Sequence, residues 1–480
     1  MKFSFSWLKD YLETDLSADE VGDILTDTGL EVESLIDPRK RLGQLSVGEI
    51  LKVEKHPNAD KLKVCDVDSG TGILKIVCGA PNVKNGMKVV VAKPGDFIPG
   101  LNINLKASKI RDVKSEGMMC SEKELEISDE HDGIIELPSE TEVGTLFSTL
   151  VGDEKIIFEI AITPNRPDAL GIYGIARDLS ASGIGKLRVS KIPNVEGIFK
   201  PHLNINLDQA VSSKECPFFV GRYLRSVQNG ESPQWLRNRL LSIGLNPISA
   251  LVDITNYLTF DRARPLHVFD ADKLSGGLTV RRSFEGEKFH ALDDKIYKLN
   301  EGMIVITDEK EIVSLGGIIG GMKSAVSDET KNVLLEAAYF DPISIAATGR
   351  KLQINSDARY RFERGVDPSF TLSGSHIATK MILDLCGGEA SDIIIAGSVP
   401  SFEKKIIFDT KKVNQLIGIE VNRARQFEIL KSLGFSVKEV ENKAEIIVPA
   451  WRPDVHGEVD IIEEVARINS LANLPSIPMT

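Results

Sequence analysis

The chain has 480 residues, of which 42% are apolar and 27% are charged, so we expect three or four globular domains and exclude wholesale disorder. Its net charge of −12 would normally count against nucleic-acid binding, and its five scattered cysteines, without a C-x-x-C pair, argue against a disulfide framework or a structural zinc site. Such cysteines are typical of reduced core thiols in a cytoplasmic protein.

The first residues contain no apolar run long enough for a signal peptide, and no later stretch approaches a membrane span, so we expect a soluble protein without a membrane partner. Residues 1–38 are predicted to form two short helices and a strand. Ser17 and Glu20 form a capping-box pattern, and Gly29 suits the left-handed position that ends a helix. This piece is too small to be stable alone.

Residues 39–150 change to short strands that are broken by Gly, Asn and Pro, which favours a small β-barrel. The charge is uneven here, because residues 39–114 carry 15 Lys plus Arg against 7 Asp plus Glu, whereas residues 115–142 carry 1 against 10. The basic stretch is where a polyanion would bind.

Three segments of this region, HPNADKL, IVCGAPN and IRDVKSEGMMCSEKEL, resemble the tRNA-binding oligonucleotide-binding fold that is attached to several aminoacyl-tRNA synthetases. We expect Asn58, Asn82 and Ser115 to hold loops or ribose, and a set of basic side chains to follow the phosphates. That basic set is Lys61, Lys63, Lys106, Lys109, Arg111 and Lys114. The alternative is a solvated lysine face on a purely structural barrel.

Residues 151–195 predict a strand, a turn and a helix, with Asp168 as the helix N-cap. Residues 401–478 repeat this order, with Arg-Pro-Asp in both turns, so we infer a small helix-and-strand domain that occurs twice. Its first copy is then discontinuous, formed by residues 1–38 and 151–195 around the inserted barrel. Chance similarity is the alternative.

Residues 200–400 alternate strands and helices and form the largest predicted domain. Two of its stretches place polar residues among apolar ones, which is unusual for plain core. One runs from Gly244 to Asp270, and the other runs from Leu315 to Pro368 and contains a lone acid, Glu336, in an apolar run. We expect these two stretches to form the walls of a pocket.

The second repeat copy also carries an acidic cluster. Asp460, Glu463 and Glu464 share one face of the predicted helix, and Asp454 lies just before it, whereas the first copy lacks these acids. Four carboxylates without a nearby cysteine suit a hard cation such as Mg²⁺. The alternative is that the acids favour the amino end of the helix, with Asp454 as its cap.

Five motifs occur here in one order: SWLKDYL, the barrel segments, VDITNYLTFDRARPLHVFD, SDARYRFERGVDP and RPDVHGEVDIIEEVARI. Over essentially the whole chain they resemble the beta subunit of bacterial phenylalanyl-tRNA synthetase, a class II aminoacyl-tRNA synthetase. The resemblance implies an α+β multidomain fold with two small winged-helix-like domains, an inserted oligonucleotide-binding barrel and a large mixed α/β editing domain.

The resemblance also implies partners and cofactors. In that family an alpha subunit attaches phenylalanine to tRNA(Phe) with ATP, the beta subunit contributes tRNA contacts and hydrolyses mischarged tyrosyl-tRNA(Phe), and the subunits form an alpha2beta2 heterotetramer. The family positions that match the four acids carry a magnesium site shared with the alpha subunit. Family members continue into a catalytic-like and an anticodon-binding module, so we expect a truncated form that ends at Thr480.

Editing needs a group that detects the tyrosine hydroxyl, because a pocket shaped for phenylalanine rejects an added hydroxyl only weakly, by roughly 100-fold. Glu336 is the candidate acceptor for that hydroxyl, and a core Glu paired with Arg361 or Arg364 is the alternative. The other expected pocket residues are His267, Thr255, Asn256, Gly317, Gly320, Ser356 and Ala358.

We expect His267 to hold a water or the ribose end, or else to be structural, and Thr255 with Asn256 to hold the amine or carbonyl, or else to cap a helix that starts at Tyr257. No Ser-His-Asp or Cys-His set emerges, so hydrolysis would use a positioned water, helped by the tRNA's terminal hydroxyl. Asn246 replaces an arginine that many relatives carry. Two rival functions are a stand-alone trans-editing hydrolase and a non-catalytic tRNA-binding or assembly protein.

Overall fold

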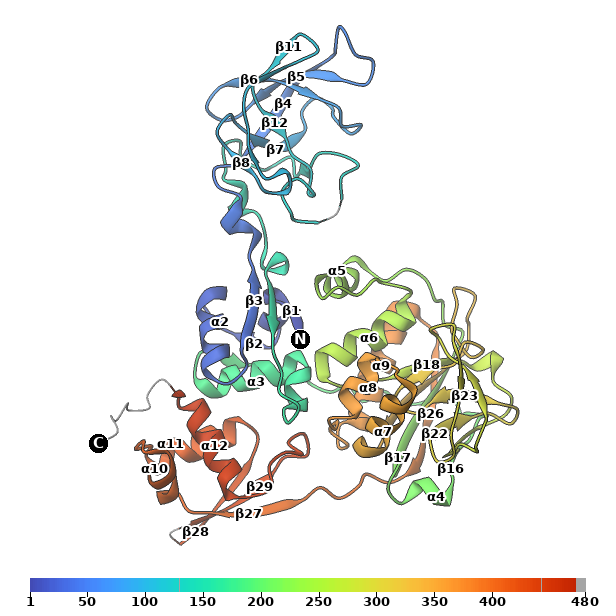
Figure 1. Cartoon of the computed structure of the whole chain (residues 1–480). Helices are drawn as coiled ribbons and strands as arrows, with labels where there is room; N and C mark the ends of the chain where they lie inside the picture. Colours follow the sequence, from blue (N-terminus) through green and yellow to red (C-terminus); the bar gives the residue numbers. More distant parts are fainter. Residues whose placement is uncertain (129, 442, 472–480) are drawn as a thin grey trace. The chain divides into compact units, whose positions relative to one another are not determined.

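The computed structural model describes residues 1–128, 130–441 and 443–471, and the predicted end of the second small domain, 472–478, lies outside these residues. The chain separates into two compact units. One contains Met1–Phe3, Trp7–Ser34 and Phe158–Thr480, and the other contains Ser4–Ser6 and Leu35–Ile157 (Figure 1). In the described part of the chain, no helix combines the length and the apolar character needed to cross a membrane.

The smaller unit is built on an antiparallel sheet in the order β12-β7-β4-β5-β6, with β13 also paired to β7. Buried side chains such as Val89, Val91 and Ile76 fill its core. The short strands predicted for this region are therefore present, together with two short hairpins, β8–β9 and β10–β11. The bounds are β4 (Ser46–Lys55), β5 (Lys63–Asp68), β6 (Ile73–Cys78), β7 (Lys88–Ala92), β8 (Phe97–Ile98), β9 (Ile103–Asn104), β10 (Ser108–Ile110), β11 (Val113–Ser115), β12 (Met118–Met119) and β13 (Glu136–Leu137).

The first small helix-and-strand region has a three-stranded sheet in the order β1-β14-β3. The predicted capping box is present, because the Ser17 hydroxyl accepts from the Glu20 amide and the Glu20 carboxylate accepts from the Ser17 amide. The N-cap role of Asp168 was wrong: Gly171 precedes helix α3, and Asp168 binds the guanidinium groups of Arg166 and Arg177. The bounds are β1 (Lys2–Ser4), α1 (Phe5–Lys9), β2 (Leu12–Glu13), α2 (Ala18–Asp27), β3 (Val32–Ile36), β14 (Ile157–Ile160), α3 (Ile172–Ser182) and β15 (Lys186–Leu187).

The middle region contains two larger sheets around one apolar core, in the orders β16-β19-β22-β23-β24 and β18-β25-β17-β26, and a two-stranded sheet of β20 and β21. Helix α9 packs on β25 and β17, and α6 packs on α9. The strands are β16 (Ile205–Leu207), β17 (Phe218–Arg225), β18 (His267–Asp270), β19 (Leu278–Arg282), β20 (Lys288–His290), β21 (Ile296–Lys298), β22 (Ile304–Thr307), β23 (Ile312–Leu315), β24 (Ile319–Gly320), β25 (Val333–Tyr339) and β26 (Glu389–Gly397). The helices are α4 (Gln209–Ser212), α5 (Gln234–Ser242), α6 (Ala250–Arg262), α7 (Pro342–Leu352), α8 (Asp357–Phe362) and α9 (Thr371–Cys386).

The last region has a three-stranded sheet in the order β27-β29-β28. In this sheet, as in β1-β14-β3, the strand that comes last in the chain is central, and an Arg-Pro-Asp turn and a helix follow it. The bounds are β27 (Lys404–Phe408), α10 (Lys411–Ile417), α11 (Arg423–Ser432), β28 (Ser436–Val440), β29 (Lys443–Val448) and α12 (Glu458–Ile468). The chain is thus a mixed α/β multidomain protein.

Candidate functional site

A cavity of about 520 Å³ lies in the middle region and is lined by residues of α6, β18, β24, β25 and α8. It brings together all the pocket residues that the sequence predicted: Thr255, Asn256, His267, Gly317, Gly320, Glu336, Ser356 and Ala358. The two polar-in-apolar stretches therefore form its walls. Apolar side chains such as Val252, Leu266 and Phe362 complete the lining, as expected for a site that binds an amino-acid side chain.

Glu336 lies in the middle of β25, where it is paired in register with Gly221 on β17 and His267 on β18. Its residue is 6% exposed, and in the described part of the chain its Oε2 atom has no hydrogen-bond partner. Burial raises the pKa of Glu336 to about 8, an effect that the nearby Arg264 opposes. Near pH 7 the group is therefore mostly a neutral carboxylic acid, which can both donate and accept a hydrogen bond.

The alternative pairing of Glu336 with Arg361 or Arg364 does not occur. The Arg361 guanidinium donates to the Leu170 carbonyl at 3.3 Å and to the Asp357 carboxylate at 3.2 Å. The Arg364 guanidinium donates to the Tyr360 carbonyl at 2.8 Å and to the Glu363 carboxylate at 2.9 Å. Both cations are thus engaged elsewhere, and the Glu336 carboxyl group borders the cavity without an ion pair among the described residues.

His267 begins β18, and its ring meets the ring of Phe269 edge-on at 4.5 Å between centroids. Burial lowers the pKa of His267 to about 4, so the imidazole is neutral at neutral pH, and its Nε2 atom has no partner in the described structure. Gly320 makes room for this ring, because a Cβ atom there would lie 2.4 Å from the His267 Cε1 atom. The absence of a side chain at Gly320 therefore accommodates the histidine ring.

Thr255 and Asn256 lie inside α6, which starts at Ala250, so the alternative that they cap a helix starting at Tyr257 was wrong. The Thr255 hydroxyl donates to the Val252 carbonyl at 2.7 Å. Ser356 is the N-cap of α8: its hydroxyl accepts from the Arg359 amide at 3.1 Å and donates to the Ile318 carbonyl at 2.6 Å.

Gly317 has a φ of +66°, and a Cβ atom there would lie 2.9 Å from the Phe340 ring.

Sequence reasoning missed several lining residues, including Ile248, Leu292 and Asp357. Asp357 carried a signal, because it stands in the polar segment SDARYRFERGVDP beside predicted pocket residues. Asn246 is exposed in the loop before α6, two residues from the lining residue Ile248.

In the smaller unit, four of the six predicted basic residues lie at the β10–β11 hairpin: Lys106, Lys109, Arg111 and Lys114, all exposed. Lys109 and Lys114 are directly paired in register. The hairpin is held by the HPNAD segment, since His56 Nε2 bonds the Ile110 carbonyl at 3.0 Å and the Asn58 amide donates to the Arg111 carbonyl at 3.4 Å.

The other predicted residues of the smaller unit differ in their contacts. Lys61 is exposed, but the Lys63 ammonium group donates to the Val83 carbonyl at 3.0 Å. Asn82 holds a loop through two bonds to the backbone of Ile134, and the Ser115 hydroxyl accepts from the Val77 amide at 3.1 Å. Asn58 and Asn82 therefore hold loops, whereas Ser115 links β11 to β6, and contact of these residues with ribose stays a prediction.

Three family models match the chain in the order of its regions: a tRNA binding domain over residues 45–146, the B3/4 domain over residues 215–387 and the tRNA synthetase B5 domain over residues 406–470. The whole chain is 52% identical to a phenylalanine–tRNA ligase beta subunit from Ruegeria pomeroyi and 51% identical to one from Paramagnetospirillum magneticum. The chain belongs to the family of phenylalanine–tRNA ligase beta subunits.

The chain spans 60% of the length of these beta subunits. Among solved structures, an N-terminal fragment of the phenylalanyl-tRNA synthetase beta subunit from Pyrococcus horikoshii matches with a TM-score of 0.35 at 18% identity, over 65% of this chain and 87% of that chain. A similarity this low does not bear on the site. The assignment to the beta-subunit family rests on the sequence identity and on the three domain models.

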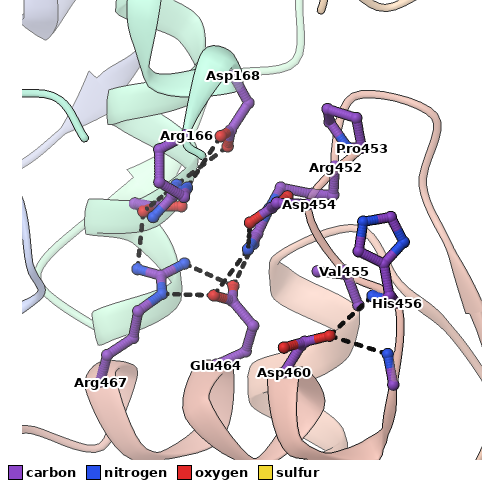
Figure 2. A network of polar contacts seen from close by, with 12 residues as sticks. Arg166, Asp168, Arg452, Pro453, Asp454, Val455, His456, Asp460, Glu464 and Arg467 are labelled. Carbon is purple, nitrogen blue, oxygen red and sulfur yellow. Dashed lines mark hydrogen bonds and ion pairs between the residues drawn. The ribbon is translucent and has the colours of Figure 1, made fainter. Parts of the chain in front are cut away.

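The spacing of Asp454, Asp460, Glu463 and Glu464, and the resemblance to the beta-subunit family, led us to expect a magnesium site, but the structure does not group these side chains in that way. Glu464 is buried between Arg452 and Arg467, and the Asp454 carboxylate accepts two bonds from Arg452 at 2.8 and 2.9 Å (Figure 2). Asp460 accepts from the backbone amides of His456 and Gly457, both at 2.8 Å (Figure 2). Within the described ranges, no three His, Cys, Asp or Glu side chains are arranged to hold a metal ion.

Glu464 and its partners instead form a buried ion network. Arg467 on α12 donates to Glu464 and also to Asp178 on α3, the latter at 2.8 Å. Burial alone would raise the pKa of Glu464, but Arg467 and Arg452 outweigh it and hold this pKa far below the usual range. Asp178 and Glu464 each stand twelve positions after the arginine of an Arg-Pro-Asp turn and each bind that arginine. The acids therefore do not fit a magnesium site in this structure.

Proposed function

We propose that the chain is the editing and tRNA-binding part of a phenylalanine–tRNA ligase beta subunit and that its central cavity hydrolyses tyrosyl-tRNA(Phe). The observation that carries this proposal is the position of Glu336, a buried carboxyl group that borders an apolar cavity of about 520 Å³ with one oxygen unpartnered. An aromatic amino acid fits a chamber of this size and lining.

Selectivity for tyrosine follows from the cost of leaving Glu336 unpaired. A tyrosyl ester would place its phenolic hydroxyl against the Glu336 carboxyl group, which then gains a hydrogen-bond partner. A phenylalanyl ester would exclude water from the same group and provide no partner, which costs about 1–3 kcal/mol. A site that bonds a hydroxyl can reject the analogue without it by roughly 10⁴-fold. The neutral acid form of Glu336 suits this role because it pairs with a neutral phenol without a buried charge.

The lining hydroxyls do not form a nucleophile with His267. Each donates its proton to a backbone carbonyl: Thr255 to Val252, Thr259 to Thr255, Ser314 to Ile319 and Ser356 to Ile318. An activated serine or threonine would donate to the histidine instead. We infer that a water molecule attacks the ester, that the neutral His267 Nε2 atom holds or accepts a proton from that water, and that the terminal hydroxyl of the tRNA assists.

The tRNA-binding role is proposed for the basic β10–β11 hairpin and Lys61. The hairpin tip is fixed by His56 and Asn58, so the exposed cations Lys109, Arg111 and Lys114 lie on an ordered base. Exposed lysine and arginine side chains on a short, supported hairpin suit contact with phosphates rather than reading of base sequence. The match of residues 45–146 to a tRNA binding domain supports the same role.

We propose the remaining features at the level of the family. A separate alpha subunit would form phenylalanyl-tRNA with ATP and Mg²⁺, and the two subunits would assemble as alpha2beta2 in the cytoplasm. The proposed domains are 1–38 with 151–195, 39–150, 200–400 and 401–478, with the first and last as copies of one winged-helix-like domain. No step of the editing proposal involves a metal ion.

The test is a deacylation assay of tyrosyl-tRNA(Phe) and phenylalanyl-tRNA(Phe) with the chain alone and after addition of a phenylalanine–tRNA ligase alpha subunit. Preferential loss of the tyrosyl ester in either arm supports the proposal, and activity of the chain alone identifies a trans-editing hydrolase. Binding of tRNA without hydrolysis in both arms would contradict it and favour a non-catalytic tRNA-binding protein.

A further inference from the structure

Asp357 gives the cavity its charge. Among the described lining residues the ionisable side chains are Glu336, His267 and Asp357, and none is a lysine or an arginine. Burial raises the pKa of Glu336 to about 8 and lowers the pKa of His267 to about 4, so both are mostly neutral near pH 7. The Asp357 side chain is 53% exposed and forms an ion pair with Arg361 at 3.2 Å, so it is the lining carboxylate that pairs with a cation.

An aminoacyl ester presents the opposite charge. Its α-amino group is protonated at and below neutral pH. Moving such a cation into a mostly apolar chamber costs free energy unless an anion there pairs with it. We propose that Asp357 accepts the α-ammonium group of the esterified amino acid, while Glu336 binds the side-chain hydroxyl. This inference rests on the proposed editing function and adds a residue that decides how the substrate is oriented.

The position of Asp357 is fixed on one side only. It is the first residue of α8, directly after the N-cap Ser356, and its Oδ1 atom accepts from the Arg361 guanidinium at 3.2 Å. Arg361 is 2% exposed, and Phe260 lies under it with 4.2 Å between the guanidinium carbon and the ring centroid. The buried Arg361 guanidinium therefore holds Oδ1, whereas Oδ2 has no hydrogen bond among the described residues.

The two acids also differ in depth, which matches the shape of a tyrosyl ester. Glu336 is in the middle of a sheet strand and is 6% exposed, whereas Asp357 starts a helix and its side chain is half exposed. The phenolic oxygen and the α-amino group of tyrosine are at opposite ends of the residue. A deep neutral acid and a charged acid nearer to solvent would therefore bind one substrate in a single orientation.

A purely structural role makes a different prediction. An acid in the first turn of a helix stabilises that helix, and Asp357 pairs with Arg361 at the favourable i, i+4 spacing. If this were its whole role, Asp357→Asn would slow the hydrolysis of every ester by the same factor. A role at the α-ammonium group slows only the hydrolysis of esters that have one.

The experiment compares two esters of tRNA(Phe): the tyrosyl ester and the 3-(4-hydroxyphenyl)propionyl ester, which lacks the amino group and keeps the phenol. Single-turnover hydrolysis is measured for the full chain, with an alpha subunit where that is required, and for Asp357→Asn and Asp357→Glu. The ratio of the two rates in each variant is divided by the ratio in the unchanged chain, which cancels the chemical difference between the esters.

We expect Asp357→Asn to slow hydrolysis of the tyrosyl ester by about 10- to 100-fold, the range of one charge-assisted hydrogen bond, and to leave the deaminated ester within about twofold. Asp357→Glu should restore part of the preference for the amine. An equal loss on both esters, or an unchanged ratio, would overturn the inference while the editing function stands. Absence of hydrolysis of both esters by the unchanged chain would instead refute the editing function, and the role of Asp357 with it.

Discussion

Glu336 on β25 and His267 on β18 are directly opposite each other in the antiparallel register of these strands, and both border the central cavity. Each has an atom without a hydrogen-bond partner in the described part of the chain. A buried acid and a neutral imidazole left in this state are costly to a folded protein, and such costs are typical of sites that bind a ligand. The following predictions depend on this pair and on the surfaces around it.

The ionisation of Glu336 has a defined dependence on pH. The pKa of Glu336 in the folded state, about 8, lies above the ordinary value of 4.5. The stability that protonated Glu336 gives the folded state is therefore fully present below pH 4.5 and is lost as pH rises through 8. Glu336→Gln removes this loss. The midpoint of thermal unfolding of that variant should therefore rise relative to the midpoint of the unchanged chain as pH rises from about 5 to 8. Carbon-13 NMR of labelled glutamate should show a carboxyl resonance that titrates near pH 8 and is missing from the variant. Titration near pH 4.5 would contradict the buried, unpaired environment.

Gly320 should be essential for the placement of His267. In Gly320→Ala the new methyl group would meet the imidazole at 2.4 Å, so the ring must move, and a displacement of about 1 Å at a reacting group can cost roughly 100-fold in rate. We expect tyrosyl-tRNA hydrolysis to fall by about that factor with little change in tRNA affinity. Gly230→Ala, where a Cβ atom meets nothing within 4 Å, is the matched control and should retain activity. Equal activity of the two variants would show that His267 is not involved.

The β10–β11 hairpin should contribute an electrostatic, salt-dependent part of tRNA binding. Replacing Lys109, Arg111 and Lys114 with alanine should weaken binding and reduce the slope of log K against log salt by up to about 3, roughly one unit for each phosphate that is no longer bound. Fluorescence anisotropy with labelled tRNA(Phe) at several salt concentrations measures both. Lys200→Ala, at an exposed lysine outside this unit, should change neither. An unchanged slope in the triple variant would mean that tRNA does not bind this hairpin.

Arg467 should stabilise the packing of α12 against α3. Arg467→Met would leave the buried carboxylates of Asp178 and Glu464 with fewer partners, and loss of one member of such a buried group costs about 3–5 kcal/mol. Amide hydrogen exchange in α3 and α12 should accelerate, because both helices would open more readily. The control Arg423→Met removes a pair with Glu439 that lies at the surface and should have little effect. Similar exchange in the two variants would show that the network does not hold the helices.

Much of this architecture could be predicted from sequence because its signals are local. The Ser17–Glu20 capping box, the short strands between Gly and Pro and the Arg-Pro-Asp turns each follow from neighbouring residues. The pocket could also be predicted, since polar residues in apolar stretches such as Glu336 are poor core and need another explanation. The start of α6 and the true bonds of Asp168 were missed, because tertiary packing decides both.

The acidic cluster shows where sequence reasoning fails. The sequence correctly predicted that Asp460, Glu463 and Glu464 lie on one helix, α12, but Glu464 is buried whereas Glu463 is exposed. Spacing carries no information about cations from other segments, and Arg452 and Arg467 engage Glu464 in this structure. Asp357 was missed for a related reason. Its i, i+4 partner Arg361 is visible in the sequence, but the sequence does not show that Asp357 lines the cavity, because distant segments form the other walls.

The most direct test of the editing account is the ratio of tyrosyl-tRNA(Phe) to phenylalanyl-tRNA(Phe) hydrolysis in the unchanged chain and in Glu336→Ala, assayed with an alpha subunit present. We predict a strong preference for the tyrosyl ester in the unchanged chain. In Glu336→Ala this preference should collapse to within about tenfold, because the group that is left unpaired by phenylalanine has been removed. A preference that survives in Glu336→Ala would contradict the claim that this carboxyl group detects the tyrosine hydroxyl.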